Sequence, residues 1–309
     1  MIDKIMNILI TGAKGQLGNE MRVMSKEHPK HRYFFTDVME ADDTSALDIT
    51  DAKAVSAFVS NHAIDLIVNC AAYTNVDKAE EDEVTAKKIN ADALSVLGGQ
   101  GIKVIHVSTD YVFSGDGHQP YREADPVSPR TVYGRTKYEG EKRLLAECPE
   151  AIILRTAWLY SSFGNNFVKT MIRLGKEKKS LGVVFDQIGT PTYAADLAQA
   201  IFTVLECPVW HPGIYHFTNE GVCSWYDFTI AIHEAAGITG CEVHPILSEE
   251  YQYQTPRPHY SVLDKSKYKK TFGVEIPYWK ASLIRCVDRL MGPTRPPHGG
   301  EGKGSMVDD

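Results

Sequence analysis

The chain has 309 residues, of which 43% are hydrophobic and 24% are charged, as in an ordinary globular protein with a large core. Its 33 basic and 40 acidic residues give a formal charge of −7 without a basic run, so neither nucleic acid nor a membrane surface is an expected partner. The sequence argues against a signal peptide or a membrane-spanning stretch, and six scattered cysteines without a C-x-x-C pair favour reduced thiols in the cytoplasm.

The first apolar run, residues 7–11, is followed at once by a glycine-rich turn and a helical pattern. Strand, glycine turn and helix form the context of a dinucleotide site. Gly12 permits the tight turn, Gly15 lets the backbone approach a pyrophosphate, and Gly18 permits close packing of helix on strand. The unpaired N–H groups at the helix start favour the anion. A turn that serves packing alone is the alternative.

The second expected strand, residues 33–37, ends in an acid. Asp37 lies about 20 residues beyond the glycine turn, where an acid binds the adenosine ribose. It would favour NAD and repel the 2′-phosphate of NADP, unless it is a solvated loop residue. Asp48 and Ile49 are expected against the adenine, and this segment also resembles an N-cap for a helix over 51–61.

Small residues follow the third expected strand, residues 65–69. Ala71 and Ala72 either leave room for a cofactor or ease the turning of the chain. Asn90 is expected within the next helix, where an amide is mildly unfavourable. We expect it to bond the backbone across to the fourth strand, with exposure to solvent as the alternative.

The fourth expected strand, residues 103–108, leads to the residues that carry chemistry. Tyr133 and Lys137 are four positions apart, so on a helix they share a face. A positive charge beside the phenol would lower the pKa of Tyr133 toward neutral pH and make it a proton donor. The hydroxyl of Thr109, at the strand's carboxyl end, would bond a reacting carbonyl.

A second tyrosine–lysine pair, Tyr138 and Lys142, has the same spacing. It would face another direction, since five residues turn a helix by roughly 140°. The first pair is preferred because it lies in the first turn, nearest the strand ends. Two surface tyrosines with solvated lysines are the alternative for both pairs.

Further ligand contacts are expected beyond the strand ends. The loop over 115–129 is rich in Gly, Pro and Asp and could fold over a ligand. Trp158, after a fifth strand at 151–155, would flank a sugar or pack internally. Arg257 would clamp a diphosphate or be an ordinary surface arginine.

The alternation of strands and helices predicts an α/β fold: a Rossmann-type doubly wound parallel sheet with a smaller C-terminal α/β substrate-binding domain. Residues 1–160 would form the NAD(P)-binding domain, with returning segments near 182–222. Residues 161–291 would form the interleaved substrate-binding region, and 292–309 a flexible tail. Later elements are expected as helices over 165–176, 194–205, 225–236 and 279–291, and as strands at 183–185, 213–217 and 262–264.

Taken together, these residues resemble an extended short-chain dehydrogenase/reductase and, more narrowly, the dTDP-4-dehydrorhamnose reductase family. The resemblance runs from Met6 to about Met291. It rests on the segments NILITGAKGQLG, VNCAAYTNVDKAE, VSTDYVFSG, SPRTVYGRTKYEGE, ILRTAWLYSSFGNNFVKTM and DQIGTPTYAADLA.

The resemblance implies reduction of the C4 keto group of dTDP-4-dehydro-L-rhamnose by NADPH or NADH, in a monomer or homodimer. It implies Thr109, Tyr133 and Lys137 as catalytic residues, with no metal site assigned. Expected cofactor contacts are Gly12, Gly15, Gln16, Leu17, Gly18, Asp37, Asp48, Ile49, Ala71, Ala72, Tyr133 and Lys137. Expected substrate contacts are Thr74, Thr109, Tyr111, Tyr133, Trp158, Asn166 and Arg257.

Two other functions stay open at this point. A sugar-nucleotide dehydratase would carry a second carboxylate where Tyr111 stands, which disfavours dehydration, whereas an epimerase or another nucleotide-sugar reductase fits the triad. A non-catalytic subunit like the regulatory beta subunit of methionine adenosyltransferase is the alternative from another class. The intact set of Thr109, Tyr133 and Lys137 weighs against it.

Overall fold

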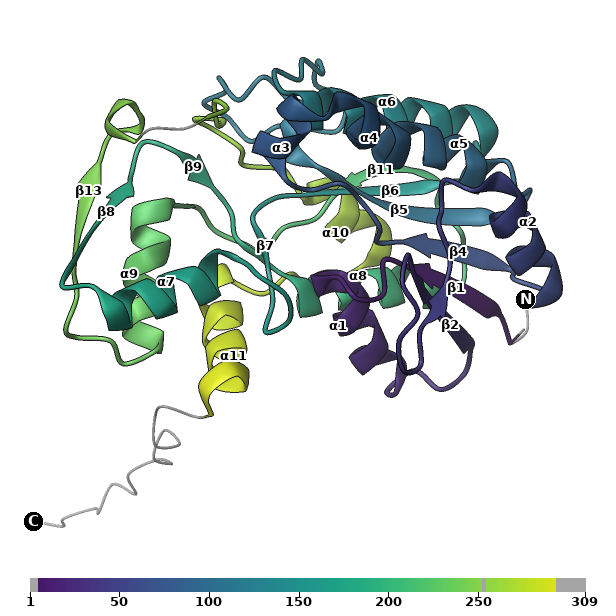
Figure 1. Cartoon of the computed structure of the whole chain (residues 1–309), viewed down its shortest axis with the longest axis horizontal. Helices are drawn as coiled ribbons and strands as arrows, with labels where there is room; N and C mark the ends of the chain where they lie inside the picture. The colour runs from purple at the N-terminus through teal and green to yellow at the C-terminus, as the bar shows by residue number, and fades with distance from the viewer. Residues whose placement is uncertain (1–4, 252–253, 293–309) are drawn as a thin grey trace, which may run out of the picture.

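A seven-stranded sheet, parallel throughout, forms the centre of the protein (Figure 1). The computed structural model describes residues 5–251 and 254–292. From edge to edge the strands are β11 (Gly213–His216), β6 (Ile152–Thr156), β5 (Lys103–Thr109), β4 (Leu66–Asn69), β1 (Asn7–Thr11), β2 (Arg32–Asp37) and β3 (Ser45–Ala46). The order reverses beside β1, which is the point where open α/β sheets bind ligands.

Helices cover both faces of this sheet (Figure 1). One face carries α1 (Gln16–Ser25), α8 (Ala194–Glu206) and α10 (Ser266–Phe272). The other carries α2 (Ala52–Asn61), α3 (Val76–Glu81), α4 (Glu83–Lys87), a π-helical turn (Lys88–Asp92), α5 (Ala93–Gly98) and α6 (Val132–Glu147).

Alternation along the strands builds the two cores. In β1, Ile8 and Ile10 enter the cluster under α1 and α8, whereas Leu9 enters the cluster under α2 and α5. Buried parallel strands therefore read as continuous apolar runs although each face is used separately. This confirms the predicted fold class.

A second group of elements lies beside the carboxyl ends of the strands (Figure 1). Its elements are β7 (Leu159–Tyr160), α7 (Phe167–Glu177), β8 (Ser180–Val184), β9 (Ile188–Gly189), β10 (Thr192–Tyr193), β12 (Cys223–Ser224), α9 (Trp225–Ala235), β13 (Glu242–Ile246) and α11 (Trp279–Met291). Strands β8 and β13 pair in parallel, and α7 and α9 pack in one apolar cluster with α11. Two short 3₁₀ turns, Asp110–Val112 and Ser248–Glu250, complete the described elements.

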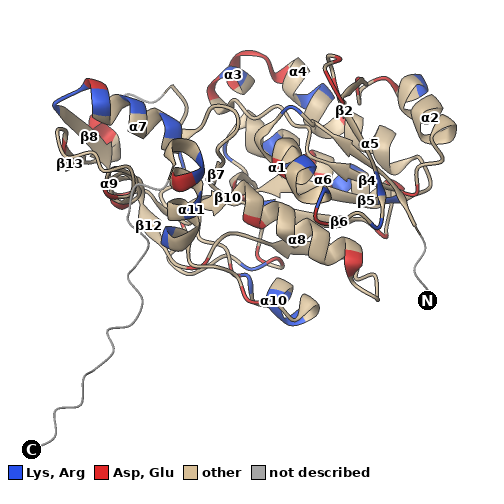
Figure 2. Cartoon of the chain, turned by 90° about the horizontal axis from the view of Figure 1, so that it is seen from below, with Lys and Arg blue, Asp and Glu red and all other residues tan. Residues whose placement is uncertain are grey.

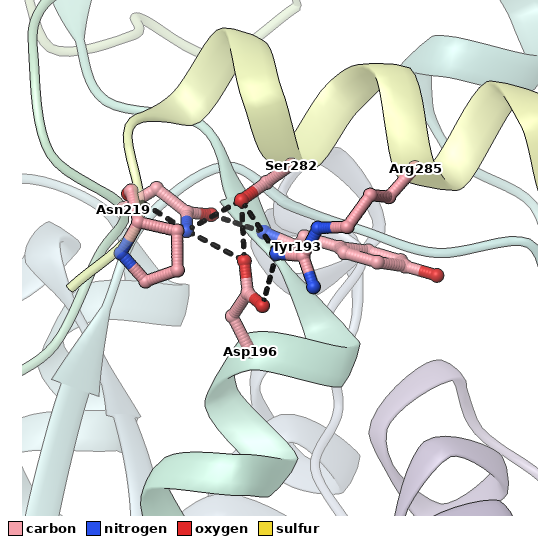
Figure 3. Close-up of polar contacts among 6 residues, drawn as sticks. Tyr193, Asp196, Asn219, Ser282 and Arg285 are labelled. Carbon is pink, nitrogen blue, oxygen red and sulfur yellow. Dashed lines mark hydrogen bonds and ion pairs between the residues drawn. The ribbon is translucent and has the colours of Figure 1, made fainter. Parts of the chain in front are cut away.

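A buried polar network fastens α8 to α11 (Figure 3). Asp196 Oδ2 accepts hydrogen bonds from Asn219 Nδ2 at 2.7 Å and from Ser282 Oγ at 2.5 Å. Asp196 Oδ1 pairs with Arg285 Nη2 at 2.5 Å. Asn219 Oδ1 in turn accepts from the backbone N–H of Tyr193 at 2.8 Å. The network thus holds the second group against a helix of the main sheet.

The predicted elements meet the observed ones with a few corrections. Asp51, rather than the segment from Asp48, caps α2 by accepting from Lys53 N and Ala54 N. Asn90 bonds the backbone of Tyr73, in the loop after β4, not the fourth strand. The expected strand at 262–264 is a single bridge between Tyr121 and Leu263.

The predicted division into domains stays a prediction. Within the expected returning segment, α8 packs against α1 and β11 joins the main sheet, whereas β8 pairs with β13. The predicted tail lies outside the described residues except for Gly292. Acidic and basic residues are both spread over the ribbon in Figure 2. Within the described part of the chain, no helix combines the length and apolar character needed to cross a membrane.

Candidate active site

The glycine-rich turn joins β1 to α1 and touches the chain that follows β4. Gly12 has a φ of 64°, and a Cβ there would lie 2.6 Å from Ala71 N. A Cβ on Gly18 would clash with the carbonyl oxygen of Gly12. Both positions therefore require glycine for the close approach of backbone to backbone. Gly15 stands at the N-cap of α1 and provides no side-chain cap, so the helix start suits an anion.

Asp37 lies at the carboxyl end of β2, next to the glycine turn. Its Oδ2 accepts from Lys14 N and its Oδ1 from Val38 N, each at 2.9 Å. Asp48 instead bonds both the N–H and the hydroxyl of Thr50, which lowers the pKa of its carboxyl group. Ile49 is buried and packs in the cluster under α2. Neither Asp48 nor Ile49 borders the cavity described next.

A cavity of about 530 Å³ opens at the carboxyl ends of β1, β4, β5 and β6. Residues from the glycine turn, the strand ends, α6 and the start of α7 all border it. Of the expected site residues, those lining it are Gly15, Gln16, Leu17, Ala72, Thr74, Thr109, Tyr111, Tyr133, Lys137, Trp158 and Asn166. Gly12, Gly18 and Ala71 lie behind this lining, where they set the backbone positions.

Tyr133 and Lys137 stand in the first turns of α6 and face the same cavity, as their spacing predicts. The helix start is fixed twice: Thr131 Oγ1 accepts from Gly134 N at 3.0 Å, and Glu80 Oε1 accepts from Val132 N at 2.7 Å. These two hydrogen bonds hold the start of α6, and with it the phenol of Tyr133, beside the carboxyl ends of the strands.

Lys137 is oriented toward β5. Its Nζ donates to the carbonyl oxygen of Val107 at 2.7 Å and lies 3.1 Å from His106 Nε2. The side chain is 1% exposed, and burial lowers the pKa of Lys137 to about 8, against an opposing effect of Glu141.

The expected lowering of the tyrosine pKa is wrong for the ligand-free protein. Burial raises the pKa of Tyr133 to about 12; a hydrogen bond with Thr109 lowers it, and the charge of Asp110 raises it further. Lys137 does not contribute to this shift, and its Nζ is directed at β5. The phenol therefore stays protonated at neutral pH, as an acid must be.

Thr109 ends β5 and links the phenol to a buried carboxyl group. Its Oγ1 donates to Asp110 Oδ1 at 2.9 Å and accepts from Tyr111 N at 3.2 Å. Burial raises the pKa of Asp110 to about 7. Thr109 must therefore release Asp110 before its proton can reach a carbonyl in the cavity.

A second cavity of about 360 Å³ lies between the strand ends and the second group. Tyr111 and Trp158 border both cavities. Trp158 adopts a φ of 48° and stacks on Trp225 with ring centroids 3.5 Å apart. Arg257 also lines this cavity, where its Nη2 pairs with Asp77 Oδ2 at 2.8 Å.

The amide of Asn166 is used largely within the protein. Its Oδ1 caps α7 by accepting from Lys169 N, and its Nδ2 donates to Gln16 Oε1 at 3.0 Å and Ser161 O at 2.7 Å. This residue joins the glycine-turn helix to α7, so its expected contact with substrate competes with these internal bonds.

The second tyrosine–lysine pair lies elsewhere, as expected. Lys142 Nζ sits 4.8 Å from the ring centroid of Tyr138, whose ring packs near Val112 and Phe113. Neither residue borders either cavity.

Sequence reasoning missed Asn69 and His106, which contact each other and lie behind Lys137. The available signal was a polar residue inside each of two apolar strands, where burial demands a hydrogen-bond partner. No group of three or more His, Cys, Asp or Glu residues that could hold a metal occurs within 5–251 and 254–292.

A glycine-rich turn and a tyrosine–lysine pair face one cavity at the switch point of a parallel sheet, and this fold and site define an NAD(P)-dependent oxidoreductase. A family model described as the RmlD substrate binding domain matches residues 6–291. The dTDP-4-dehydrorhamnose reductase of Aggregatibacter actinomycetemcomitans is 40% identical over 289 residues, covering 89% of this chain and 96% of that protein. The chain belongs to the dTDP-4-dehydrorhamnose reductase family.

Solved structures agree with this assignment. The dTDP-4-dehydrorhamnose reductase of Clostridium acetobutylicum is 43% identical with a TM-score of 0.86, and the match covers 92% of this chain and 99% of that one. The Bacillus anthracis dTDP-4-dehydrorhamnose reductase, in complex with NADP, is 35% identical with a TM-score of 0.84, covering 93% and 100%.

Proposed function

We propose that this protein reduces the C4 keto group of dTDP-4-dehydro-L-rhamnose to the alcohol of dTDP-L-rhamnose, using NADPH or NADH. The observation that carries the proposal is the shared cavity, in which Thr109, Tyr133 and Lys137 face the start of α1. The residues of the glycine turn that line this cavity would bind the cofactor. The residues at the strand ends would hold the ketone between the cofactor and the phenol of Tyr133.

The residues present fit a dinucleotide. The glycine turn excludes side chains where a pyrophosphate would approach, and the uncapped start of α1 offers N–H groups to it. Asp37 would accept a hydrogen bond from the adenosine ribose in exchange for its bond with Lys14 N. Lys137 would reach the nicotinamide ribose from behind. When bound, the reduced nicotinamide supplies the hydride.

Tyr133 is the proposed acid. Reduction leaves a negative charge on the C4 oxygen, and the phenol O–H would give its proton to that oxygen, becoming a phenolate that regains a proton from solvent. With its pKa raised to about 12 by burial, the free phenol holds its proton through neutral pH. Thr109 would orient the carbonyl once its hydroxyl turns from Asp110 Oδ1.

The second cavity would take the nucleotide end of the substrate. The stacked Trp158 and Trp225 rings offer a flat apolar wall of the kind that binds a base. Arg257 would bind the diphosphate, exchanging its contact with Asp77 for a second anion. Thr74 and Tyr111, which border the first cavity, would contact the sugar between the two ends.

The six cysteines are free thiols, which fits a reducing compartment, and we propose that the enzyme acts in the cytoplasm. Its proposed partner is the nucleotide sugar, and a monomer or a homodimer is the proposed assembly.

The test is consumption of reduced nicotinamide, followed by absorbance, with purified protein and dTDP-4-dehydrorhamnose. We expect consumption that requires the sugar and yields a product with a C4 hydroxyl. Cofactor binding without consumption at any pH would instead favour a non-catalytic binding subunit. UDP-linked and other dTDP-linked 4-keto sugars, assayed in parallel, distinguish this substrate from those of related reductases.

A further inference from the structure

A chain of buried polar side chains crosses three neighbouring strands behind the active-site cavity. Strand register sets Thr11 of β1 opposite Asn69 of β4, and Asn69 opposite His106 of β5. All three side chains are completely buried, and the chain ends at Lys137. Buried polar groups in such a row are either fully paired or costly, so the direction of each hydrogen bond can be worked out.

The orientation of the Asn69 amide is fixed from one side. A backbone N–H can only donate, and Ala71 N lies 3.2 Å from one terminal atom of Asn69, which must therefore be the oxygen. The same oxygen accepts from Thr11 Oγ1 at 2.5 Å. The other terminal atom is the nitrogen Nδ2, and it donates to His106 Nδ1 at 2.9 Å.

The orientation of this amide determines which ring nitrogen of His106 carries the proton. An imidazole that accepts at Nδ1 and is neutral carries its proton on Nε2. That N–H points at Lys137 Nζ, 3.1 Å away. An ammonium in that position would set donor against donor, whereas an uncharged amine offers its lone pair to the imidazole. The amine still has a proton for the carbonyl oxygen of Val107.

We propose that Asn69 and His106 are positioning residues for Lys137: they hold its Nζ against β5 and, by directing an imidazole N–H at it, make its ammonium easier to deprotonate in the ligand-free protein. The inference deepens the proposed function, because it concerns the lysine of that site. It makes the protonation of Lys137 depend on Asn69, which acts on the lysine only through His106.

The charged groups around the lysine are consistent with this assignment. Glu141 lies one turn further along α6, but Arg155 of β6 holds it in a two-pronged pair with distances of 2.9 and 2.6 Å. Burial lowers the pKa of Lys137 to about 8, and burial together with that lysine lowers the pKa of His106 well below its usual value. On the cavity side stand the phenol of Tyr133 and the buried carboxyl group of Asp110. The imidazole therefore stays neutral while the amine titrates.

The first test reads the imidazole directly, without any substrate. Protein labelled with ¹⁵N-histidine is followed by NMR between about pH 6 and 9, a range that includes the usual histidine pKa of about 6.5. The His106 signals, identified by their loss in His106→Gln, should show a bare Nδ1 and a protonated Nε2 throughout. A proton on Nδ1, or titration of the ring in this range, overturns the proposal.

The second test moves the imidazole proton of His106 from Nε2 to Nδ1. In Asn69→Asp, the new carboxylate would accept from Nδ1–H, which turns the Nε2 lone pair toward Lys137 and stabilises its ammonium. We expect the imidazole proton to move to Nδ1 and the alkaline limb of kcat/KM for the reduced cofactor to shift upward by at least about one pH unit. Asn7→Asp, at the other end of β1, is the matched control and should leave both unchanged.

The outcomes are separable. If Asn69→Asp only lowers stability while the proton and the alkaline limb stay in place, Asn69 has a structural role and the proposal fails. If the variant does not fold, the labelled wild-type protein decides alone. A protein that lacks turnover but shows the expected imidazole proton would remove the proposed function and leave this arrangement standing.

Discussion

The two cavities are built in different ways. The first gathers residues at the ends of adjacent parallel strands, where register brings Thr109 of β5 beside Thr156 of β6 and the first two turns of α6 add Tyr133 and Lys137. The second is assembled by packing: Trp158 meets Trp225, and Arg257 meets Asp77, across long stretches of sequence. In this fold, topology positions the chemistry and packing positions the groups that recognise the substrate.

That difference predicts distinct failures. Damage to the first cavity should abolish turnover while leaving the fold intact, because its frame is the sheet. Damage to the second should weaken substrate binding or loosen the second group, because its frame is a set of side-chain contacts. Four substitutions test this contrast, from the largest expected effect to the smallest.

Tyr133→Phe should bind cofactor normally and lose turnover by about 10²–10⁴-fold, the usual cost of a lost acid. The matched control is Tyr138→Phe, the same change on the same helix outside both cavities. Steady-state kcat and cofactor titration measure the two quantities. Near-normal turnover in Tyr133→Phe would require another proton donor.

Asp196→Ala should cost about 3 kcal/mol in the free energy of unfolding, because it leaves the buried donors Asn219 and Ser282 without their acceptor (Figure 3). Urea unfolding measures the loss. Asp42→Ala, at an exposed loop position, is the control and should stay within about 0.5 kcal/mol. Equal stability of the two variants would show that the network does not fasten the second group.

Trp225→Leu should raise the KM for the nucleotide sugar about tenfold with little change in kcat, since it removes the ring that supports Trp158. Trp210→Leu makes the same change at a ring that packs on Lys103, away from both cavities. A fall in kcat at constant KM would place the stacked rings with the chemistry instead.

Asp37→Ala should reduce the ratio of kcat/KM for NADH to kcat/KM for NADPH about fivefold. This is the scale of one lost hydrogen bond to a charged group. The ratio is measured with both cofactors under the same conditions, and Asp42→Ala again serves as the control. An unchanged ratio would remove Asp37 from the ribose contact.

Much of the first cavity could be predicted, because its signals are local. A run of apolar residues followed by glycines specifies a strand, a turn and a helix whatever the rest of the chain does. Four-residue spacing places Tyr133 and Lys137 on one helix face, and both border the cavity.

The contacts that these side chains make depend on the tertiary structure and could not be read from the sequence. The sequence put a lysine near a tyrosine, but the depth of the cavity and His106 determine that Lys137 Nζ faces β5 and that the pKa of Tyr133 rises. Asn166 matched a substrate position and turned out to cap α7 and hold Gln16. Local pattern sets which element forms and which face it presents, whereas burial and hydrogen-bond pairing depend on residues that only tertiary packing brings together.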